Sequence, residues 1–187
     1  MERILETNIS VTNHLTSVSI LKGMNCGLIG GLTGTIVMDL FLMGAFTIAG
    51  LPALTCFLVI GNTFAGFFSI ENIEMARAIQ IGVLTHYVIG PLIGALFGMA
   101  VVRIKSLRVE TMKKSILLAI LYVELISQPL LATTPILLNM RGPVLLVWYG
   151  GSFLMHLIAA VVLGTVVYRG LCLGSVTRPR GFHKAKI

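Results

Sequence analysis

Two histidines of this chain, His86 and His156, each lie in a long apolar run in which every fourth residue is mostly small. The two series are Gly82, His86, Gly90, Gly94, Gly98 and Ser152, His156, Ala160, Gly164, Tyr168. A step of four residues keeps a series on one face of a helix. An ionisable side chain inside a membrane-spanning helix is by default a hypothesis for a functional site. The spacing therefore predicts two helices that each carry one imidazole on a ridge which other helices can approach closely.

Carboxylates accompany these histidines in two other apolar runs. One run carries Asp39, and the other carries Glu124 with Gln128 one turn later. The predicted intramembrane polar cluster is Asp39, His86, Glu124, Gln128 and His156. The rise of a helix places Asp39, His86 and His156 at a similar depth near the middle of the membrane, with Glu124 about one turn deeper.

Three kinds of chemistry suit such a cluster. The leading interpretation is hydrogen bonding between helices without a cofactor, because polar residues in membrane bundles commonly pair in this way. A carboxylate and an imidazole can also share a proton, which suits proton or ion handling. The third interpretation is a cofactor site, in which His86, His156 and Asp39 bind a transition metal or the two histidines hold a haem. The sequence leaves these alternatives open.

Composition indicates the class of protein. The chain has 187 residues, of which 56% are hydrophobic and 11% charged, and its mean hydropathy is +0.96. A soluble domain would carry about a quarter charged residues. Four apolar runs are long enough to cross a hydrocarbon layer of about 30 Å, namely residues 24–49, 76–102, 115–140 and 144–168. We therefore predict an all-α integral membrane protein whose four-helix bundle occupies residues 24–170.

Positive charge is unevenly distributed between the two ends of these runs. With four spans, twelve of the fourteen Lys and Arg residues fall on one side, and only Arg77 and Arg141 on the other. Because positive charge favours the cytoplasmic side, this predicts a multi-pass protein of the cell membrane. Its N-terminal segment (residues 1–23) and its basic tail (residues 171–187) are then both cytoplasmic. A fifth apolar run, residues 51–70, is predicted to be re-entrant or interfacial, because a fifth span would weaken the asymmetry.

The four predicted spans also pair into two similar halves. Asp39 precedes His86 in the first half, and Glu124 precedes His156 in the second. Each half holds two spans, so both halves have the same orientation, which predicts a parallel two-fold repeat. Small residues are predicted to form the packing faces between helices, in particular Gly27, Gly31, Gly90, Gly94, Gly98, Ala160 and Gly164.

Three motifs resemble those of a known family. They are G-L-I-G-G-L-T-G-T-I-V-M-D at residues 27–39, A-G-L-P at residues 49–52, and H-x-x-x-[GA]-x-x-x-G at both His86 and His156. Together they are similar to the YagU-like small membrane proteins of bacteria and archaea, over about residues 24–170. That group is uncharacterised, so the resemblance implies a four-helix membrane protein and no catalytic residues.

No motif points to an enzyme. The chain lacks G-x-S-x-G, a phosphate-binding loop, a dinucleotide fingerprint and H-E-x-x-H. The leading prediction is a non-enzymatic membrane subunit or a small-solute-handling protein in the lipid bilayer, as a homo-oligomer or as part of a larger membrane complex. The alternatives are a metal- or haem-binding redox protein that uses His86 and His156, and a proton-coupled transporter. Nucleic acid is not an expected partner, because the basic residues flank the spans.

Overall fold

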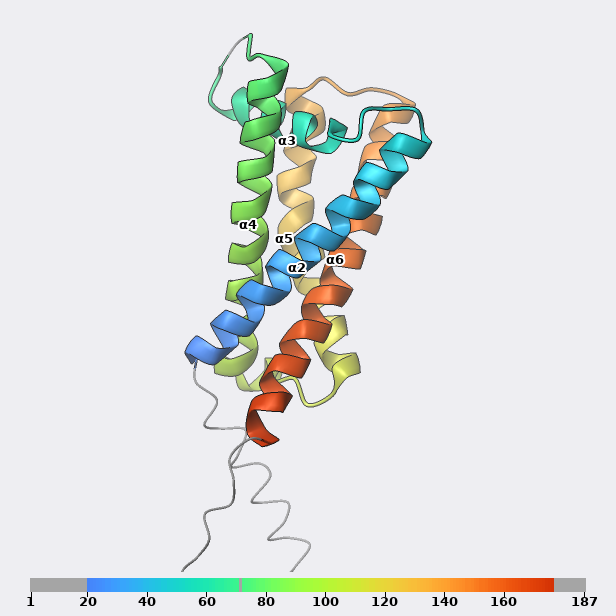
Figure 1. Ribbon diagram of the computed structural model, residues 1–187. Helices are drawn as coiled ribbons and strands as arrows, with labels where there is room; N and C mark the ends of the chain where they lie inside the picture. Colours follow the sequence, from blue (N-terminus) through green and yellow to red (C-terminus); the bar gives the residue numbers. More distant parts are fainter. Residues whose placement is uncertain (1–19, 71, 177–187) are drawn as a thin grey trace, which may run out of the picture.

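The protein consists of long helices packed side by side, with one short helix across one end (Figure 1). The computed structural model describes residues 20–70 and 72–176, without the side chains of residues 173–176. Over these residues all regular structure is helical. The elements are α2 (Ile20–Ile48), α3 (Thr55–Phe67), α4 (Met75–Arg103), the short 3-10 helix η1 (Lys105–Leu107), α5 (Met112–Leu137) and α6 (Pro143–Val176).

Four of these helices, α2, α4, α5 and α6, are long and apolar enough to cross a membrane. The shortest of them has 26 residues, which is about 39 Å of helix and exceeds the roughly 30 Å hydrocarbon layer. This confirms the predicted all-α fold and its four long apolar helices. α3 has 13 residues and is too short to span. The bounds differ slightly from those predicted, because α6 continues to Val176, past the predicted start of the tail.

Local sequence explains where the helices begin and end. The Thr111 hydroxyl accepts a hydrogen bond from the Lys114 backbone N–H at 3.2 Å and caps the first turn of α5. Gly50, after α2, has a φ of 74°, and Gly142, before α6, has a φ of 59°. Glycine adopts this left-handed conformation without strain. Pro143 then occupies the first position of α6, where its missing N–H costs no helical hydrogen bond.

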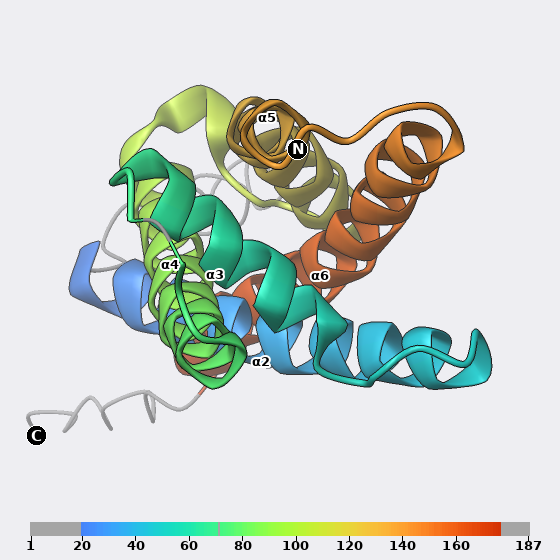
Figure 2. The same cartoon turned by 90° about the horizontal axis from the view of Figure 1, so that it is seen from above.

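The long helices do not form a regular ring. α2 runs diagonally across α4 and α6 (Figure 1), and α6 also packs along α5. α4 and α5 make few contacts with each other. An exact two-fold repeat would pack α4 on α5 in the way that α2 packs on α6, so the two halves differ in their contacts. α3 lies over α4 at one end and reaches toward α5 (Figure 2).

The two ends of the molecule differ in charge. We call the end covered by α3 the α3 end, and the opposite end, where α2 begins and α4 stops, the basic end. Among the described Lys and Arg residues, Arg77 and Arg141 are near the α3 end. The others are near the basic end: Lys22, Arg103, Lys105, Arg108, Lys113, Lys114 and Arg169.

A glycine seam joins α2 to α4. Gly23, Gly27 and Gly31 of α2 face Gly98, Gly94 and Gly90 of α4 in antiparallel order. A Cβ atom built at Gly27 would overlap the Gly94 carbonyl oxygen, and one at Gly98 would overlap that of Gly23. The two backbones are therefore in direct contact, which only residues without a side chain permit. Small residues also pack elsewhere: Gly164 of α6 lies against Ser115 and Ile116 of α5.

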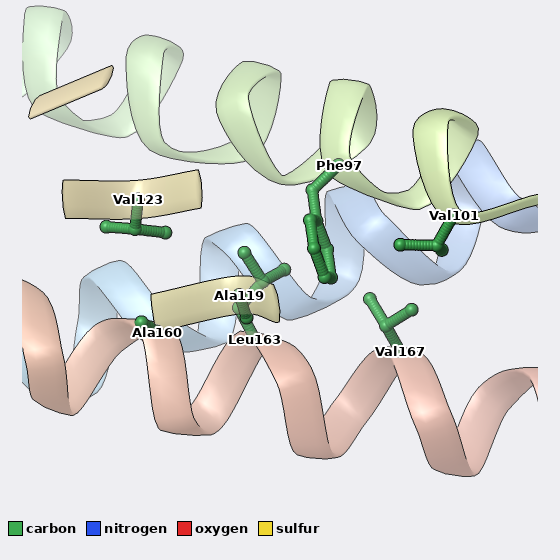
Figure 3. Close-up of a cluster of buried hydrophobic side chains, with 7 residues drawn as sticks. All are labelled: Phe97, Val101, Ala119, Val123, Ala160, Leu163 and Val167. Atoms are coloured by element: carbon green, nitrogen blue, oxygen red, sulfur yellow. The ribbon is translucent and has the colours of Figure 1, made fainter. Parts of the chain in front are cut away.

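Figure 3 shows the apolar core, whose buried residues belong to the halves of α4, α5 and α6 nearer the basic end. It is formed by α4, α5 and α6, and its buried residues are Phe97, Val101, Ala119, Val123, Ala160, Leu163 and Val167. Four residues of the predicted polar cluster (Asp39, His86, Gln128 and His156) lie nearer to the α3 end of their helices than this core, and Glu124 directly follows the core residue Val123. This polar layer thus borders the apolar core on its α3 side.

Candidate functional site

The glycine seam continues directly into a buried pair of ionisable residues. On α2 the four-residue series runs through Gly31 and Thr35 to Asp39, and on α4 it runs back from Gly90 to His86. A Cβ atom at Gly90 would overlap the Thr35 hydroxyl, so Thr35 and Gly90 face each other. One turn further along, Asp39 Oδ1 lies 3.1 Å from His86 Nδ1. The register of the seam therefore brings the two side chains together.

The carboxylate of Asp39 is almost completely enclosed. Its side chain is 3% exposed and that of His86 is 15% exposed. Neither carboxylate oxygen receives a hydrogen bond from a described residue, and the His86 Nδ1 atom makes none. The 3.1 Å contact is therefore an electrostatic one in which the ring N–H is not directed at the oxygen. A buried charge with so few partners is costly, and such residues in membrane helices mark proton and ion pathways.

α3 closes over this pair from the α3 end. A Cβ atom at Gly61 would overlap the carbonyl oxygen of Ala78, and one at Gly82 would overlap that of Phe57. These glycines let α3 lie directly on α4. The Phe57 ring then meets the His86 imidazole edge-on, with centroids 6.1 Å apart. The short helix, which does not span, thus provides the apolar cover of the ionisable pair.

Two further polar side chains surround Asp39. Cys56 of α3 is buried, and burial together with the nearby Asp39 carboxylate raises the pKa of its thiol to about 11. The phenol of Tyr87 on α4 lies close enough to the Asp39 carboxylate to act as a hydrogen-bond donor to it. The described Lys and Arg residues lie near the two ends of the helices, away from this site. Asp39 therefore faces an imidazole, a phenol and a thiol, and no permanent positive charge.

The second carboxylate of the layer is bound within its own helix. Gln128 Nε2 donates to Glu124 Oε2 at 2.7 Å, one turn along α5. The other oxygen, Glu124 Oε1, is buried without a hydrogen bond, as is the hydroxyl of Ser127. Glu124 thus retains an unused acceptor, although part of its charge is stabilised by the amide.

His156 forms no such pair with a carboxylate. Its Nδ1 lies 2.7 Å from the Ser152 carbonyl oxygen on the same helix. A carbonyl oxygen only accepts, so Nδ1 carries the proton of this bond and Nε2 is the acceptor of the neutral ring. His156 is close enough to both Glu124 and His86 for an electrostatic interaction. It therefore lies near Glu124 and His86 without a hydrogen bond to either.

The predicted metal ligands are not assembled. Among the described residues no three His, Cys, Asp or Glu side chains are arranged to hold one metal ion. Asp39 lies beside His86, whereas His156 is hydrogen-bonded to a backbone carbonyl of its own helix. The structure thus brings Asp39 and His86 together, joins Glu124 to Gln128, and leaves His156 near these groups without a hydrogen bond to them.

Three prolines inside α4 and α5 release backbone carbonyls within the same part of the bundle. Each proline lacks the N–H that would bond the carbonyl four residues earlier. Pro91 releases the carbonyl of Tyr87, Pro129 releases that of Leu125, and Pro135 releases that of Leu131. Trp148 Nε1 of α6 donates to the Leu131 carbonyl at 3.2 Å. Among the side-chain hydrogen bonds of the described residues, none reaches the Tyr87 carbonyl, which directly follows His86.

Several of these features escaped the sequence analysis. The roles of Cys56, Phe57 and Tyr87 depend on where α3 docks, which no local pattern indicates. The one available signal was Gly82, which belongs to the predicted small-residue ridge and provides the clearance for Phe57. The pairing of Trp148 with a carbonyl released by Pro135 likewise joins two helices and has no signature in either one.

Comparisons of the chain with known protein families, with curated proteins and with solved structures find no match. The resemblance to YagU-like proteins therefore stays a prediction. What the protein does has to be argued from the geometry of the polar layer.

Proposed function

We propose that this protein handles a small solute in the membrane and couples it to proton exchange at the Asp39–His86 pair. The observation that supports this most is the pair itself, with a carboxylate 3% exposed, no hydrogen-bond donor on either oxygen and an imidazole 3.1 Å away. A purely structural carboxylate would be expected to have its acceptors filled. This one retains unused proton-binding capacity.

The chemistry of the pair suits a carrier of protons. An isolated carboxylate in the membrane interior is strongly disfavoured, so Asp39 is either protonated or paired with a protonated imidazole. These two states differ only in the position of one proton between neighbouring atoms. A small shift of α3 or α4 changes which state is favoured, and the proton is taken up or released as a result.

The wider proposal places this site in a multi-pass protein of the cell membrane with both termini cytoplasmic. The α3 end then faces outward, with α3 as a re-entrant or interfacial segment, because the basic end holds most of the described Lys and Arg residues. The two-fold repeat and the YagU-like membership are part of the same proposal. A redox role for His86 and His156 has less support, because His156 is hydrogen-bonded to Ser152 and no metal-ligand group is assembled among the described residues.

The first test asks whether Asp39 exchanges a proton. Infrared difference spectra of the protein in lipid are recorded while the pH is stepped between mildly acidic and mildly alkaline values. We expect a carboxylic-acid C=O band that grows as the pH falls and that is absent in Asp39→Asn. Glu74→Gln, at an exposed position before α4, removes an equal charge and should keep the band. An Asp39→Asn spectrum identical to that of the wild type would overturn the proposal.

The second test asks whether the exchange serves transport. Proteoliposomes loaded with a pH-sensitive dye receive an external pH step with equal sodium and potassium chloride on both sides. Wild-type vesicles and Glu74→Gln vesicles should equilibrate faster than protein-free vesicles, and Asp39→Asn vesicles should not. Circular dichroism of each variant shows whether it is folded. Equal rates for wild-type and protein-free vesicles would refute a role in transmembrane exchange.

A further inference from the structure

We propose that the solute exchanged for the proton at Asp39 is a small monovalent metal cation bound by oxygen atoms. This inference rests on the proposed function and specifies its substrate class. It follows from the charge balance around Asp39 and from the kinds of atoms that face it.

Charge balance excludes most other ligands. When Asp39 is deprotonated and His86 is neutral, the site holds one negative charge. The groups that face Asp39 from the neighbouring helices are His86 and Tyr87 on α4 and Cys56 on α3. None of these carries a permanent positive charge. A neutral solute would leave the carboxylate uncompensated in the membrane, and an anion would add to the repulsion. A cation restores neutrality.

Oxygen atoms outnumber the other ligands on the α2 side of the site, and among the described residues no three His, Cys, Asp or Glu side chains are arranged for a transition metal. Asp39 contributes two oxygens without donors. The Thr35 hydroxyl, one turn before Asp39, donates its proton to the Gly31 carbonyl at 2.9 Å and therefore keeps its lone pairs for a cation. Carboxylate, hydroxyl and carbonyl oxygens bind hard cations, whereas transition metals in proteins favour nitrogen and sulfur ligands.

A released carbonyl points into the same interface. Pro91 removes the helical donor of the Tyr87 carbonyl. A Cβ atom at Gly31 would lie 3.0 Å from the Pro91 Cα atom, so Pro91 is on the face of α4 that contacts α2. The carbonyl of Tyr87 points along the helix toward Pro91 and lies on this face. Carbonyls from interrupted helices are used to bind sodium ions at mid-membrane in transporters.

The glycine seam limits the size of the cation. A Cβ atom at Gly90 would overlap the Thr35 hydroxyl, so the space between the helices here is smaller than a methyl group. An organic ammonium ion with several carbon substituents does not fit beside Thr35. The cation that we propose is therefore a metal ion without carbon substituents.

The exchange is balanced in charge and in protons. One monovalent cation binds to the carboxylate as one proton leaves the carboxylic acid. The total charge of the site is the same before and after. Cation and proton therefore compete, and one proton appears in solution for each cation bound.

The test measures this proton release directly. Wild-type protein in lipid nanodiscs, in a weakly buffered solution with a pH indicator, receives lithium, sodium or potassium chloride, with choline chloride as the control at equal ionic strength. We expect saturable proton release with at least one alkali cation and none with choline. Asp39→Asn should abolish the release, and Glu74→Gln should keep it. Thr35→Val removes one ligand oxygen at nearly constant volume and should raise the half-maximal cation concentration about tenfold.

The outcomes separate the inference from the proposed function. Equal release with choline and alkali chlorides would show an ionic-strength effect and overturn the cation site. Absence of release from a wild-type protein whose Asp39 titrates in the infrared would also overturn it, while proton exchange at Asp39 would stand. A protein in which Asp39 does not titrate refutes both. An unchanged half-maximal concentration in Thr35→Val would remove Thr35 from the ligand set.

Discussion

The glycine seam between α2 and α4 makes a prediction in which the same substitution has opposite effects at two positions of one helix. Gly27 lies in the seam, and Gly44 lies near the other end of α2, where a Cβ atom would meet nothing within 4 Å. We expect Gly27→Ala to destabilise the protein and Gly44→Ala to stabilise it slightly. Both variants add one methyl group to the same helix, so each serves as the control for the other.

The magnitudes follow from the contacts. A Cβ atom at Gly27 would overlap the Gly94 carbonyl oxygen and would lie 3.0 Å from the Gly98 Cα atom. These are backbone atoms, so the clash is relieved only when the two helices move apart. Overpacking of this kind costs about 1–3 kcal/mol in the free energy of unfolding. At Gly44 the better helix propensity of alanine contributes about 0.5–1 kcal/mol in the opposite direction.

The assay is equilibrium unfolding of the purified protein in mixed micelles, followed by circular dichroism. The two variants should differ by about 2 kcal/mol or more in the free energy of unfolding. Gly94→Ala should cost as much as Gly27→Ala, and the double variant should cost less than the sum, because helices already moved apart accommodate the second methyl group. Equal stability of Gly27→Ala and Gly44→Ala would refute the direct contact of the two backbones.

Two further predictions concern a bridging hydrogen bond and the topology. Trp148→Phe should destabilise the protein by about 1 kcal/mol, because it removes the donor to the Leu131 carbonyl. In a Pro135→Ala background, the restored backbone N–H of residue 135 donates to the Leu131 carbonyl, so Trp148→Phe should lower the free energy of unfolding by less. A thermodynamic double-mutant cycle measures this coupling. In a variant without native cysteines, a membrane-impermeant thiol reagent added outside whole cells should label a cysteine at Arg141 and not one at Lys105. Labelling of both from the same side would contradict four spans.

Part of this architecture can be predicted from sequence because the determinants are local. A span must itself be apolar over about 30 Å, so α2, α4, α5 and α6 are visible in the composition of their own residues. The face on which Gly90, Gly94 and Gly98 lie follows from helical periodicity alone. That residues 51–70 do not span is predicted from the distribution of Lys and Arg along the chain, and α3 within them has 13 residues.

The partners of these faces are decided by tertiary structure. Asp39 meets His86 because the antiparallel seam between α2 and α4 sets their register, and nothing in either helix specifies that register. The two histidine motifs illustrate the difference. His86 faces a buried carboxylate, whereas His156, with the same spacing of small residues, is hydrogen-bonded to Ser152 of its own helix.

The physical reason is that a sequence motif describes one helix, whereas a site in the membrane depends on which helices approach. α2 crosses close to α4 because glycines line both helices along the seam. α3 then covers the Asp39–His86 pair, because Gly82 leaves room for Phe57. α6 packs along α5 as α4 packs along α2, but no short helix lies in the described chain between α5 and α6 to cover a pair, and Glu124 is hydrogen-bonded to Gln128 of its own helix instead of meeting His156. The amino-acid sequence alone determined the spans and their polar residues, and the packing of α2, α3 and α4 decided which of those residues form a site.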